Sequence, residues 1–413
     1  MREMQAAWPS QADYIMALQD PPSAFVDPSL QGGTVESDRV LDLPKPRSGQ
    51  MASVYKVFDG RKTWAVRCFN FASEERAGRY RAISSFLARN PNRYTVDFAY
   101  VEEGISVASR FYPIVKMEWI EGDLLHIYIA EHLAAPAVLH RLAYSWVEMT
   151  RALHELGMAH CDLQHGNVIV TPAGELKLID YDGMFVPEFS GMPSIEDGHP
   201  NYQHPCRQSG DFGPRLDNFS AWVVYLSLTA VAHDPGVWEK LRCGDDCLAF
   251  RRADFVRPSE SAAFAHLAAC ADPDVRKIAE FVRSMLSHEP AQLPDVERYA
   301  RIVRAPGAEG RGPGFAPFAA ERLAGGVFTE PYEPQRAAPR PIPVALVLGP
   351  SKFQRTAARA AVGVALTAAG SWAFHVFGFA TEQIAVVVVL GWMLAAILAI
   401  ASRNSKPPGS FSN

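Results

Sequence analysis

The stretch His160-Cys161-Asp162-Leu163-Gln164-His165-Gly166-Asn167 is followed, after a short connector, by Leu178-Ile179-Asp180-Tyr181-Asp182-Gly183. Asp162 precedes Asn167 by five residues, and Asp180 follows Asn167 by thirteen. One carboxylate can act as a general base, while an amide oxygen and a second carboxylate are the hard oxygen ligands that Mg²⁺ prefers. Apolar residues around the connector predict two short strands, 167–170 and 176–179. These strands would hold the three polar side chains in place.

This pairing of motifs resembles the catalytic loop and the metal-binding motif of the protein-kinase superfamily. The resemblance implies that Asp162 is the base, that Gln164 lies near the transferred phosphate, and that Asn167 and Asp180 hold Mg²⁺ beside ATP. Asp180 stands at the family's Asp-Phe-Gly aspartate, with Tyr181 in place of phenylalanine. Any one of these acids alone could be a solvated turn residue. Three polar residues at the family's spacing favour the catalytic interpretation.

The resemblance extends with more changes into the residues that would bind the nucleotide. Residues 48–57 stand where the family has a glycine-rich loop, and of its three glycines only Gly49 is present. The family's Val-Ala-Ile-Lys motif corresponds to Ala-Val-Arg at 65–67, so Arg67 replaces the lysine. The resemblance therefore implies that the nucleotide is contacted by Gly49, Val54, Ala65 and Arg67.

The replacement of lysine by Arg67 keeps the charge but changes its geometry, because a guanidinium is a wide planar fork and an ammonium is a compact point charge. Arg67 could contact phosphate oxygens itself, or Lys56 or Lys62 could supply an ammonium. In the family, an acidic residue of the following helix pairs with this cation. That helix is expected over 73–87, and Glu75 is the residue we expect to take this role.

The stretch Met117-Glu118-Trp119-Ile120-Glu121-Gly122 resembles the connector between the two lobes of a kinase. The resemblance implies that the backbone of Glu118 and of Ile120 hydrogen-bonds adenine, and that Met117 lines the rear of the pocket. Taken alone, the same residues also fit the end of a strand followed by a turn. Their position in the series of motifs favours the connector.

Cys161 stands where many protein kinases have an arginine that binds the phosphate of a phosphorylated activation segment. Without that cation, a phosphate on this segment would have little to order it. We therefore expect an activity that does not depend on phosphorylation of Ser190, Ser194 or Tyr202.

Two later stretches carry further landmarks of protein kinases. Residues 198–205 resemble the end of an activation segment, and residues 217–222 resemble the start of the helix whose aspartate bonds the catalytic-loop backbone. Together the motifs imply an α+β, bilobal protein-kinase-like fold with a small β-rich N-terminal lobe and a larger helical lobe. The hydrophobic pattern predicts strands at 54–58, 63–69, 105–109 and 114–119, and helices at 138–156, 218–232 and 274–286.

Composition limits the classes of partner. The chain has 413 residues, of which 48% are hydrophobic, so it can form a large core. The net charge is −5 and basic residues form no stripe, so we expect no nucleic-acid partner. Six dispersed cysteines favour reduced thiols over a disulfide framework. Cys243 and Cys247 have the spacing of half a zinc site, but no second pair of ligands follows.

The C-terminal part changes character. Stretches 360–380 and 384–401 are apolar, contain no Lys, Arg, Asp or Glu, and are long enough to cross hydrocarbon as helices. Basic residues flank both outer ends, which predicts a transmembrane hairpin in the inner membrane with the catalytic domain facing the cytoplasm. A buried helical pair is the alternative. The expected organisation is an N-terminal extension at 1–40, a kinase-like domain at 41–304, a Pro/Gly-rich linker at 305–357, two transmembrane helices at 358–403 and a tail at 404–413.

The resemblance and the hairpin together predict a membrane-anchored, ATP- and Mg²⁺-dependent kinase that phosphorylates Ser/Thr hydroxyls of an unidentified protein, with the lipid bilayer as a second partner. Arg67 and the depleted glycine loop leave open a pseudokinase scaffold that binds nucleotide but transfers phosphate poorly. Gln164, where Ser/Thr kinases have a lysine, leaves open a small-molecule kinase.

Overall fold

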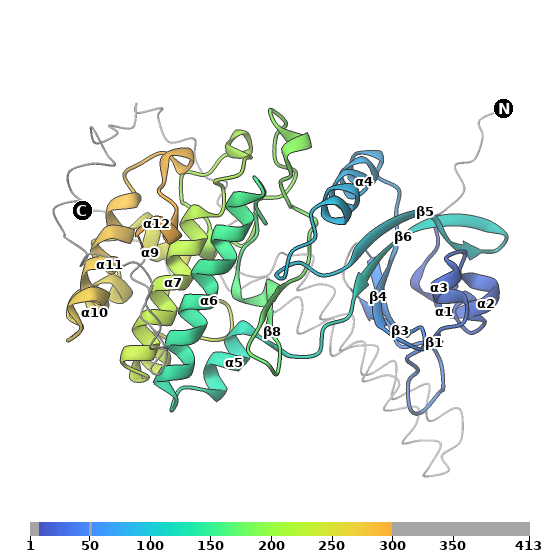
Figure 1. Cartoon of the computed structure of the whole chain (residues 1–413), viewed down its shortest axis with the longest axis horizontal. Helices are drawn as coiled ribbons and strands as arrows, with labels where there is room; N and C mark the ends of the chain where they lie inside the picture. The colour runs from blue at the N-terminus through green and yellow to red at the C-terminus, as the bar shows by residue number, and fades with distance from the viewer. Residues whose placement is uncertain (1–7, 49–51, 300–413) are drawn as a thin grey trace, which may run out of the picture. The chain divides into compact units, whose positions relative to one another are not determined.

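The computed structural model describes residues 8–48 and 52–299, all of which belong to one compact unit (Figure 1). Gly49, the linker at 305–357, the apolar stretches within 358–403 and the tail at 404–413 lie outside the described residues. Among the helices that the structure describes, none has the length and apolar character needed to cross a membrane.

An antiparallel sheet forms the N-terminal part of this unit. Its strands follow the order β1-β3-β4-β6-β5, and β2 pairs with β3. The strands are β1 Thr34–Val35, β2 Arg47–Ser48, β3 Ala52–Phe58, β4 Thr63–Phe69, β5 Phe98–Val107 and β6 Arg110–Glu118. The expected strands at 54–58, 63–69 and 114–119 are thus present. Of the one expected at 105–109, residues 105–107 end the longer strand β5, and Ala108 and Ser109 form the turn that follows, with φ of +49° and +62°.

Alternation along β4 sets the direction of its side chains, because successive residues of a strand point to opposite faces of the sheet. Trp64, Val66 and Cys68 are buried in a core beneath the sheet. Ala65 and Arg67 therefore face the other way, toward the helical part of the unit. The register places Arg67 beside Val54 of β3.

The region before the sheet is part of the fold and more than a simple extension. Its helices are α1 Gln11–Ala17, α2 Pro21–Ala24 and α3 Pro28–Gln31, and they cover the face of the sheet that points away from the helical part (Figure 1). Tyr14, Phe25 and Leu30 are fully or almost fully buried there. Asp27 also pairs with Lys116 of β6 at 2.5 Å. The sequence had not indicated this packing.

Helix α4, Glu74–Arg89, lies against β5 and is the one helix expected within the N-terminal lobe. Ser73 caps it, because its hydroxyl oxygen accepts a hydrogen bond from the Arg76 N–H at 3.3 Å. Tyr80 and Ile83 are buried on the face of α4 that meets the core. Beside this face, Arg76 of α4 pairs with Glu196 and lies near Asp182.

The rest of the unit is helical, apart from a small sheet of β7 Asp123–Leu124, β8 Val168–Val170 and β9 Leu176–Leu178. Trp146 of α6 donates its indole N–H to the Ala221 carbonyl of α7 at 3.0 Å, deep in the core. The helices are α5 Leu125–Glu131, α6 Pro136–Glu155, α7 Asn218–His233, α8 Gly236–Lys240, α9 Arg252–Val256, α10 Ala262–Ala268, α11 Pro273–Met285 and α12 Val296–Tyr299. The α+β class is confirmed, and this arrangement is compatible with a protein-kinase-like fold.

Candidate functional site

A cavity of about 360 Å³ lies between the sheet and the helical part. Arg67, Asn167 and Asp180 all line it, although they come from widely separated stretches of the chain. Five more residues that were expected to contact nucleotide line the same cavity, namely Val54, Ala65, Met117, Glu118 and Ile120. Gly49 lies outside the described residues, so its expected contact stays a prediction.

The connector residues offer backbone groups to this cavity. The Glu118 N–H is used by the Asp97 carbonyl at 2.8 Å, and the Trp119 N–H is used by the Thr63 carbonyl at 2.8 Å. Within the described part of the chain, no protein group accepts the Ile120 N–H. Ile120 therefore has the donor that a planar heterocycle with a ring nitrogen acceptor would need.

Asp162 and Asn167 form one hydrogen-bonded unit. The Asn167 Nδ2 donates to the Asp162 backbone carbonyl and to its Oδ2, each at 2.9 Å. The other carboxylate oxygen, Oδ1, accepts the His199 N–H at 2.6 Å. Asp162 is therefore fixed in orientation, and the amide oxygen of Asn167 is the atom left to bind a cation.

Asp217 supports the loop that carries Asp162. It is almost completely buried at the start of α7, and its two carboxylate oxygens accept the N–H groups of His160 at 2.5 Å and of Cys161 at 2.8 Å. Cys161 has a φ of +66°, a backbone conformation that L side chains rarely adopt. The two hydrogen bonds hold this strained turn, as the resemblance of 217–222 implied.

Asp180 is held by the residue that follows it. Tyr181 is fully buried, its hydroxyl donates to the Leu178 carbonyl at 2.8 Å, and it accepts the Val96 N–H at 2.9 Å. Asp180 itself has a φ of +64°. Its carboxylate accepts a hydrogen bond from Arg67 Nη2 at 3.1 Å. Tyr181, which stands in place of the family's phenylalanine, thus fixes the backbone next to Asp180.

Comparison with known proteins agrees with this geometry. No family model matches the chain. The chain is 29% identical over 265 residues to the serine/threonine-protein kinase PknL of Mycobacterium tuberculosis, and equally to that of Mycobacterium bovis. This chain is related to the protein kinases. The similarity covers 59% of this chain and 62% of each relative, so the chain spans less than two thirds of the length of the curated kinases it matches.

The segment that follows Asp180 returns to the loop that carries Asp162, and an arginine joins the two. Arg207 donates to the carbonyl of Cys161 at 3.1 Å, to the carbonyl of Glu196 at 2.9 Å and to the hydroxyl of Ser194 at 3.4 Å. These contacts join the segment to the loop through two backbone carbonyls and one hydroxyl. Sequence reasoning missed Arg207, since nothing local distinguishes it from a surface arginine.

Gln164 makes a hydrogen bond within its own turn. Its side-chain oxygen accepts the Gly166 N–H at 3.2 Å and so closes the short helical turn His165–Asn167. Gln164 does not line the cavity of about 360 Å³. Its expected contact with a transferred phosphate stays a prediction.

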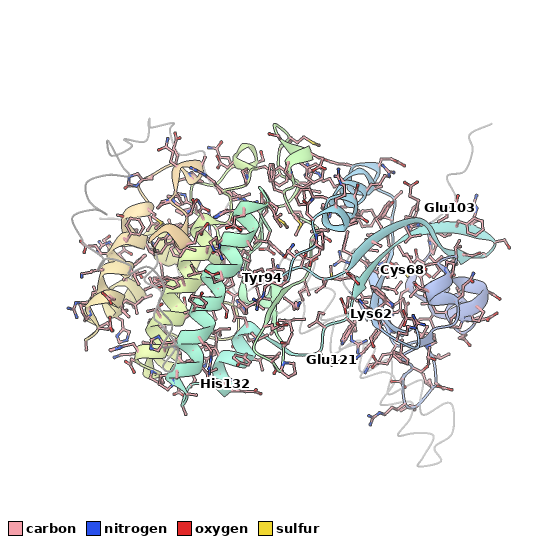
Figure 2. All side chains as sticks on the ribbon, viewed as in Figure 1. Lys62, Cys68, Tyr94, Glu103, Glu121 and His132 are labelled. Carbon is pink, nitrogen blue, oxygen red and sulfur yellow. The ribbon has the colours of Figure 1, made fainter. Side chains whose placement is uncertain are left out.

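The two lysines that the sequence left open as alternatives to Arg67 are engaged with other carboxylates. Lys56 pairs with Glu121 at 2.8 Å and lies over the Trp119 ring, while Lys62 pairs with Asp97 at 2.6 Å. Lys62 and Glu121 lie at the connection between sheet and helices (Figure 2). Neither lysine lines the cavity of about 360 Å³, because each is paired with a carboxylate. Among the residues that line this cavity, Arg67 is therefore the one with a positive charge.

Glu75 is not the partner of Arg67. Its side chain is 64% exposed and its ion-pair partner is Arg79, one helical turn away at 3.9 Å. Arg67 instead hydrogen-bonds Asp182 through Nη1 and Asp180 through Nη2. Burial by itself lowers the pKa of Arg67, but the attraction of Asp182 and Asp180 outweighs it, and the net shift is upward. Arg67 is therefore charged at any physiological pH.

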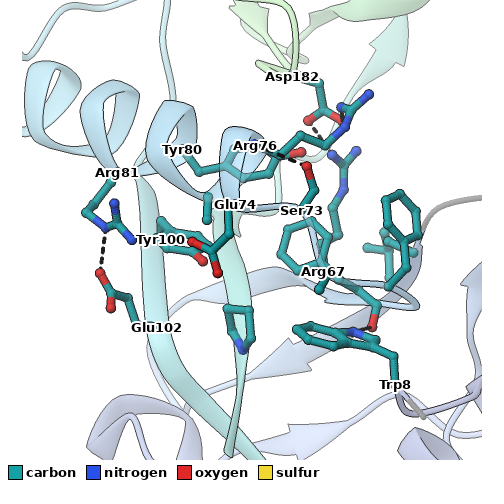
Figure 3. Close-up of a pocket in the computed structure, with 17 residues that line it drawn as sticks. Trp8, Arg67, Ser73, Glu74, Arg76, Tyr80, Arg81, Tyr100, Glu102 and Asp182 are labelled. Atoms are coloured by element: carbon teal, nitrogen blue, oxygen red, sulfur yellow. Dashed lines mark hydrogen bonds and ion pairs between the residues drawn. The ribbon is translucent and has the colours of Figure 1, made fainter. Parts of the chain in front are cut away.

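A second cavity, of about 430 Å³, shares Val54, Arg67 and Asp182 with the first. Figure 3 shows the guanidinium groups of Arg67 and Arg76 close to the Asp182 carboxylate. Trp8 closes the opposite side of this cavity, and its indole N–H donates to the Phe69 carbonyl at 2.5 Å.

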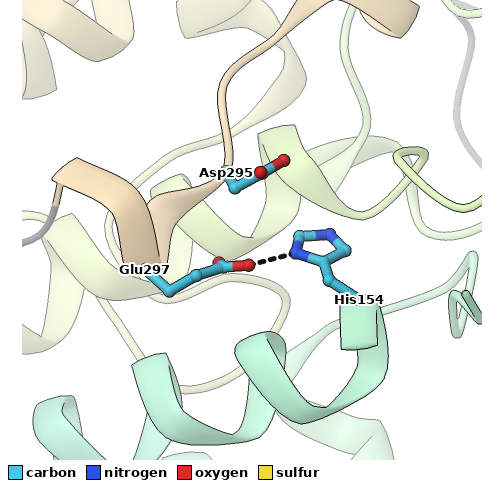
Figure 4. Close-up of side chains that lie close together, drawn as sticks. All are labelled: His154, Asp295 and Glu297. Atoms are coloured by element: carbon cyan, nitrogen blue, oxygen red, sulfur yellow. Dashed lines mark hydrogen bonds and ion pairs between the residues drawn. The ribbon is translucent and has the colours of Figure 1, made fainter. Parts of the chain in front are cut away.

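A separate polar group holds the end of the described helical part. His154 of α6 bonds through Nδ1 to the carboxylate of Glu297 (Figure 4). Asp295 accepts the Asn218 amide at 3.1 Å. Burial alone lowers the pKa of His154, but Glu297 raises it, and the net shift is upward. One atom from each of His154, Asp295 and Glu297 lies within 4.8 Å of the others. Each is bound to a protein partner, so we assign this group a structural role.

Proposed function

We propose that this protein transfers the γ-phosphate of ATP to serine or threonine hydroxyls of proteins, its own chain included. The observation that carries the proposal is the convergence of Asn167 and Asp180 on one cavity, with Asp162 hydrogen-bonded to Asn167. The name of the relatives, serine/threonine-protein kinase, supports the choice of substrate class.

The residues present fit Mg²⁺ and a nucleoside triphosphate. The Asn167 amide oxygen and the Asp180 carboxylate are hard oxygen donors on the wall of one cavity. Arg67, with its Nη2 at 3.1 Å from Asp180, lies where it would neutralise phosphate oxygens. The Ile120 N–H and the Glu118 carbonyl would bind adenine. The magnesium ion, when bound, would offset charge on the phosphates.

Asp162 would orient and deprotonate the attacking hydroxyl. A bond forms between that oxygen and the γ-phosphorus, the bond from the γ-phosphorus to the bridging oxygen of ADP breaks, and the hydroxyl proton passes to Asp162. The hydrogen bonds from Asn167 and His199 fix the carboxylate in one orientation. Positioning of this kind removes the entropy cost of aligning the base.

The apolar stretches at 360–380 and 384–401 would anchor the domain to the inner membrane, facing the cytoplasm. A tether raises the effective concentration of membrane-borne substrates. We therefore propose membrane proteins or this chain itself as the substrate. Reconstitution in lipid vesicles, with and without residues 358–413, tests the anchor by flotation: the full chain should float and the shortened chain should not.

A second candidate is a pseudokinase that binds nucleotide and signals by its conformation. The ion pair between Arg67 and Asp180 favours it, because the cation and the metal ligand are engaged with each other. Three side chains suited to catalysis, in Asp162, Asn167 and Asp180, favour the enzyme.

The test uses the full chain in detergent, incubated with ATP labelled in the γ-phosphate and with Mg²⁺. We expect label on the protein, and acid hydrolysis should yield phosphoserine or phosphothreonine. The Asp180→Ala variant should incorporate none. Tight ATP binding without incorporation would support the pseudokinase, and label found only on small molecules of a cell extract would support a small-molecule kinase.

A further inference from the structure

Helix α4 turns arginines toward the carboxylates of the segment that starts at Asp180. Arg76 pairs with Glu196 at 2.9 Å and lies 4.0 Å from Asp182. The side chain of Arg76 is only 18% exposed, and that of Asp182 only 19%. One turn further along, Arg79 donates to the Pro193 carbonyl at 2.7 Å. A partner for Arg67 on α4 would have to be negatively charged. The α4 residues that face this segment, Arg76 and Arg79, are positively charged.

Asp182 is the carboxylate that this arrangement places between the two arginines. It accepts a hydrogen bond from Arg67 Nη1 (Figure 3). Burial raises the pKa of Asp182, Arg67 opposes this shift, and the neighbouring Asp180 adds to it. The two oxygens of Asp182 thus meet different arginines: Oδ1 contacts Arg67, and Oδ2 lies near Arg76.

The two carboxylates that contact Arg67 use different nitrogens. Asp182 takes Nη1, and Asp180 takes Nη2. Asp180 is also the proposed metal ligand, so its bond to Arg67 competes with that function. Asp182 is not among the residues to which the proposed function assigns the metal. If Asp180 turned from Arg67 to the metal, a guanidinium still held by Asp182 through Nη1 would have Nη2 free for a phosphate oxygen.

We propose that Asp182 is the positioning residue for Arg67, and that Glu196, through Arg76, holds α4 against the same network. Asp182, the acid that orients Arg67, would thus come from the segment after Asp180. Helix α4 would contribute Arg76, the cation of the second pair. This inference rests on the proposed function, because it assigns Arg67 to the phosphates of ATP.

The first test measures the KM for ATP, the kcat of phosphate transfer and the melting temperature of the full chain for Asp182→Asn, Asp182→Glu and Glu75→Gln. We expect Asp182→Asn to raise the KM for ATP about 10- to 100-fold, the usual cost of removing a group that orients a ligand-binding residue. Asp182→Glu should recover part of this loss, because it restores the charge. Glu75→Gln should match the wild type.

The second test is a double-mutant cycle with Arg76→Gln and Glu196→Gln. If these residues act as a pair, the double variant should have the KM of either single variant and not the product of both effects. Glu188→Gln is the matched control, since Glu188 also pairs with α4, through Arg89 at 2.5 Å, but away from Arg67. It should leave the KM unchanged.

The outcomes separate the two proposals. A wild type that transfers phosphate, together with an Asp182→Asn variant of unchanged KM, would overturn the positioning role and leave the function intact. A large rise in the KM for ATP in Glu75→Gln would also contradict the positioning role of Asp182. A fall in melting temperature without a change in KM would assign Asp182 a purely structural role. A wild type that neither binds ATP nor transfers phosphate would overturn the function, and the positioning role with it.

Discussion

The side chain of Asn167 donates two hydrogen bonds to Asp162, one to its backbone carbonyl and one to its carboxylate, both at 2.9 Å. The two residues are five positions apart and are joined by the tight turn that Gln164 and Gly166 close. Since both amide hydrogens are used in this way, the amide oxygen is the group that Asn167 can give to a metal ion. The proposed base and the proposed metal ligand are therefore a single structural unit.

Replacement of Asn167 should affect the metal more than the nucleotide. We expect Asn167→Ala to raise the Mg²⁺ concentration for half-maximal transfer about 10- to 100-fold, because one oxygen ligand is lost. Titration of transfer activity with Mg²⁺ at saturating ATP measures this. Asn92→Ala, which alters a surface turn, is the control. An unchanged Mg²⁺ requirement in Asn167→Ala would remove Asn167 from the metal site.

Replacement of Asp217 should destabilise the protein. In Asp217→Asn, an amide donor would face one of the two buried N–H groups, of His160 and Cys161, that the carboxylate now satisfies. We expect a loss of about 1–3 kcal/mol in the free energy of unfolding. Urea unfolding followed by fluorescence measures it. The exposed residue Asp234 gives the matched control, since Asp234→Asn should change stability by less than about 0.5 kcal/mol.

Stability should fall at mildly acidic pH, in part because of His204. Its Nε2 donates to the Met285 carbonyl at 3.1 Å, and its Nδ1 accepts the Cys206 N–H at 3.3 Å, so the ring is neutral. Burial lowers the pKa of His204 from 6.5 to about 4. The unfolded chain therefore binds more protons between these values, and the free energy of unfolding decreases as pH falls through this range, by about 2–3 kcal/mol for this residue.

Urea midpoints between pH 7 and pH 4.5 test this for wild type and His204→Gln. The variant should be less stable at pH 7, but its stability should decrease less steeply as the pH falls. Parallel curves for the two proteins would show that His204 does not titrate in this way.

Activity should not require phosphorylation of the segment after Asp180. Arg207 already ties this segment to the catalytic loop through Cys161 and Glu196. Tyr202 is buried and bonded to His165 and Leu248, so it is not accessible to a kinase in the folded state. We expect the double variant Ser190→Ala, Ser194→Ala to keep transfer within about twofold of the phosphatase-treated wild type. A stimulation by phosphorylation that this variant lacks would contradict the expectation.

The local part of this site could be predicted from the sequence. Asp162, Asn167 and Asp180 belong to two short motifs, and turn geometry and two strands bring them together with little help from distant residues. Strand alternation likewise places Ala65 and Arg67 on one face. The bounds of α6, α7 and α11 differ from the expected ranges by one or two residues, because apolar periodicity fixes the middle of a helix better than its ends.

The partners of Arg67 could not be predicted in the same way. Asp182 is 115 residues away in sequence, and Glu75 has the position that a local pattern favours. The choice between them depends on which face of α4 meets the sheet, and burial of Tyr80 and Ile83 decides this. The same limit applies to Asp27 and Lys116, whose pairing joins the region before the sheet to β6. Long-range pairs of charges leave no periodic signal.

The most direct measurement is the single-turnover rate of phosphate transfer by Asp162→Asn, compared with its affinity for ATP in the presence of Mg²⁺. Asparagine keeps the shape of the side chain but cannot accept a proton. We expect a rate about 10²- to 10⁴-fold below that of the wild type, with an affinity changed by less than about twofold. A variant that transfers phosphate at the wild-type rate would contradict the role of Asp162 as the base and, with it, the proposed catalytic site.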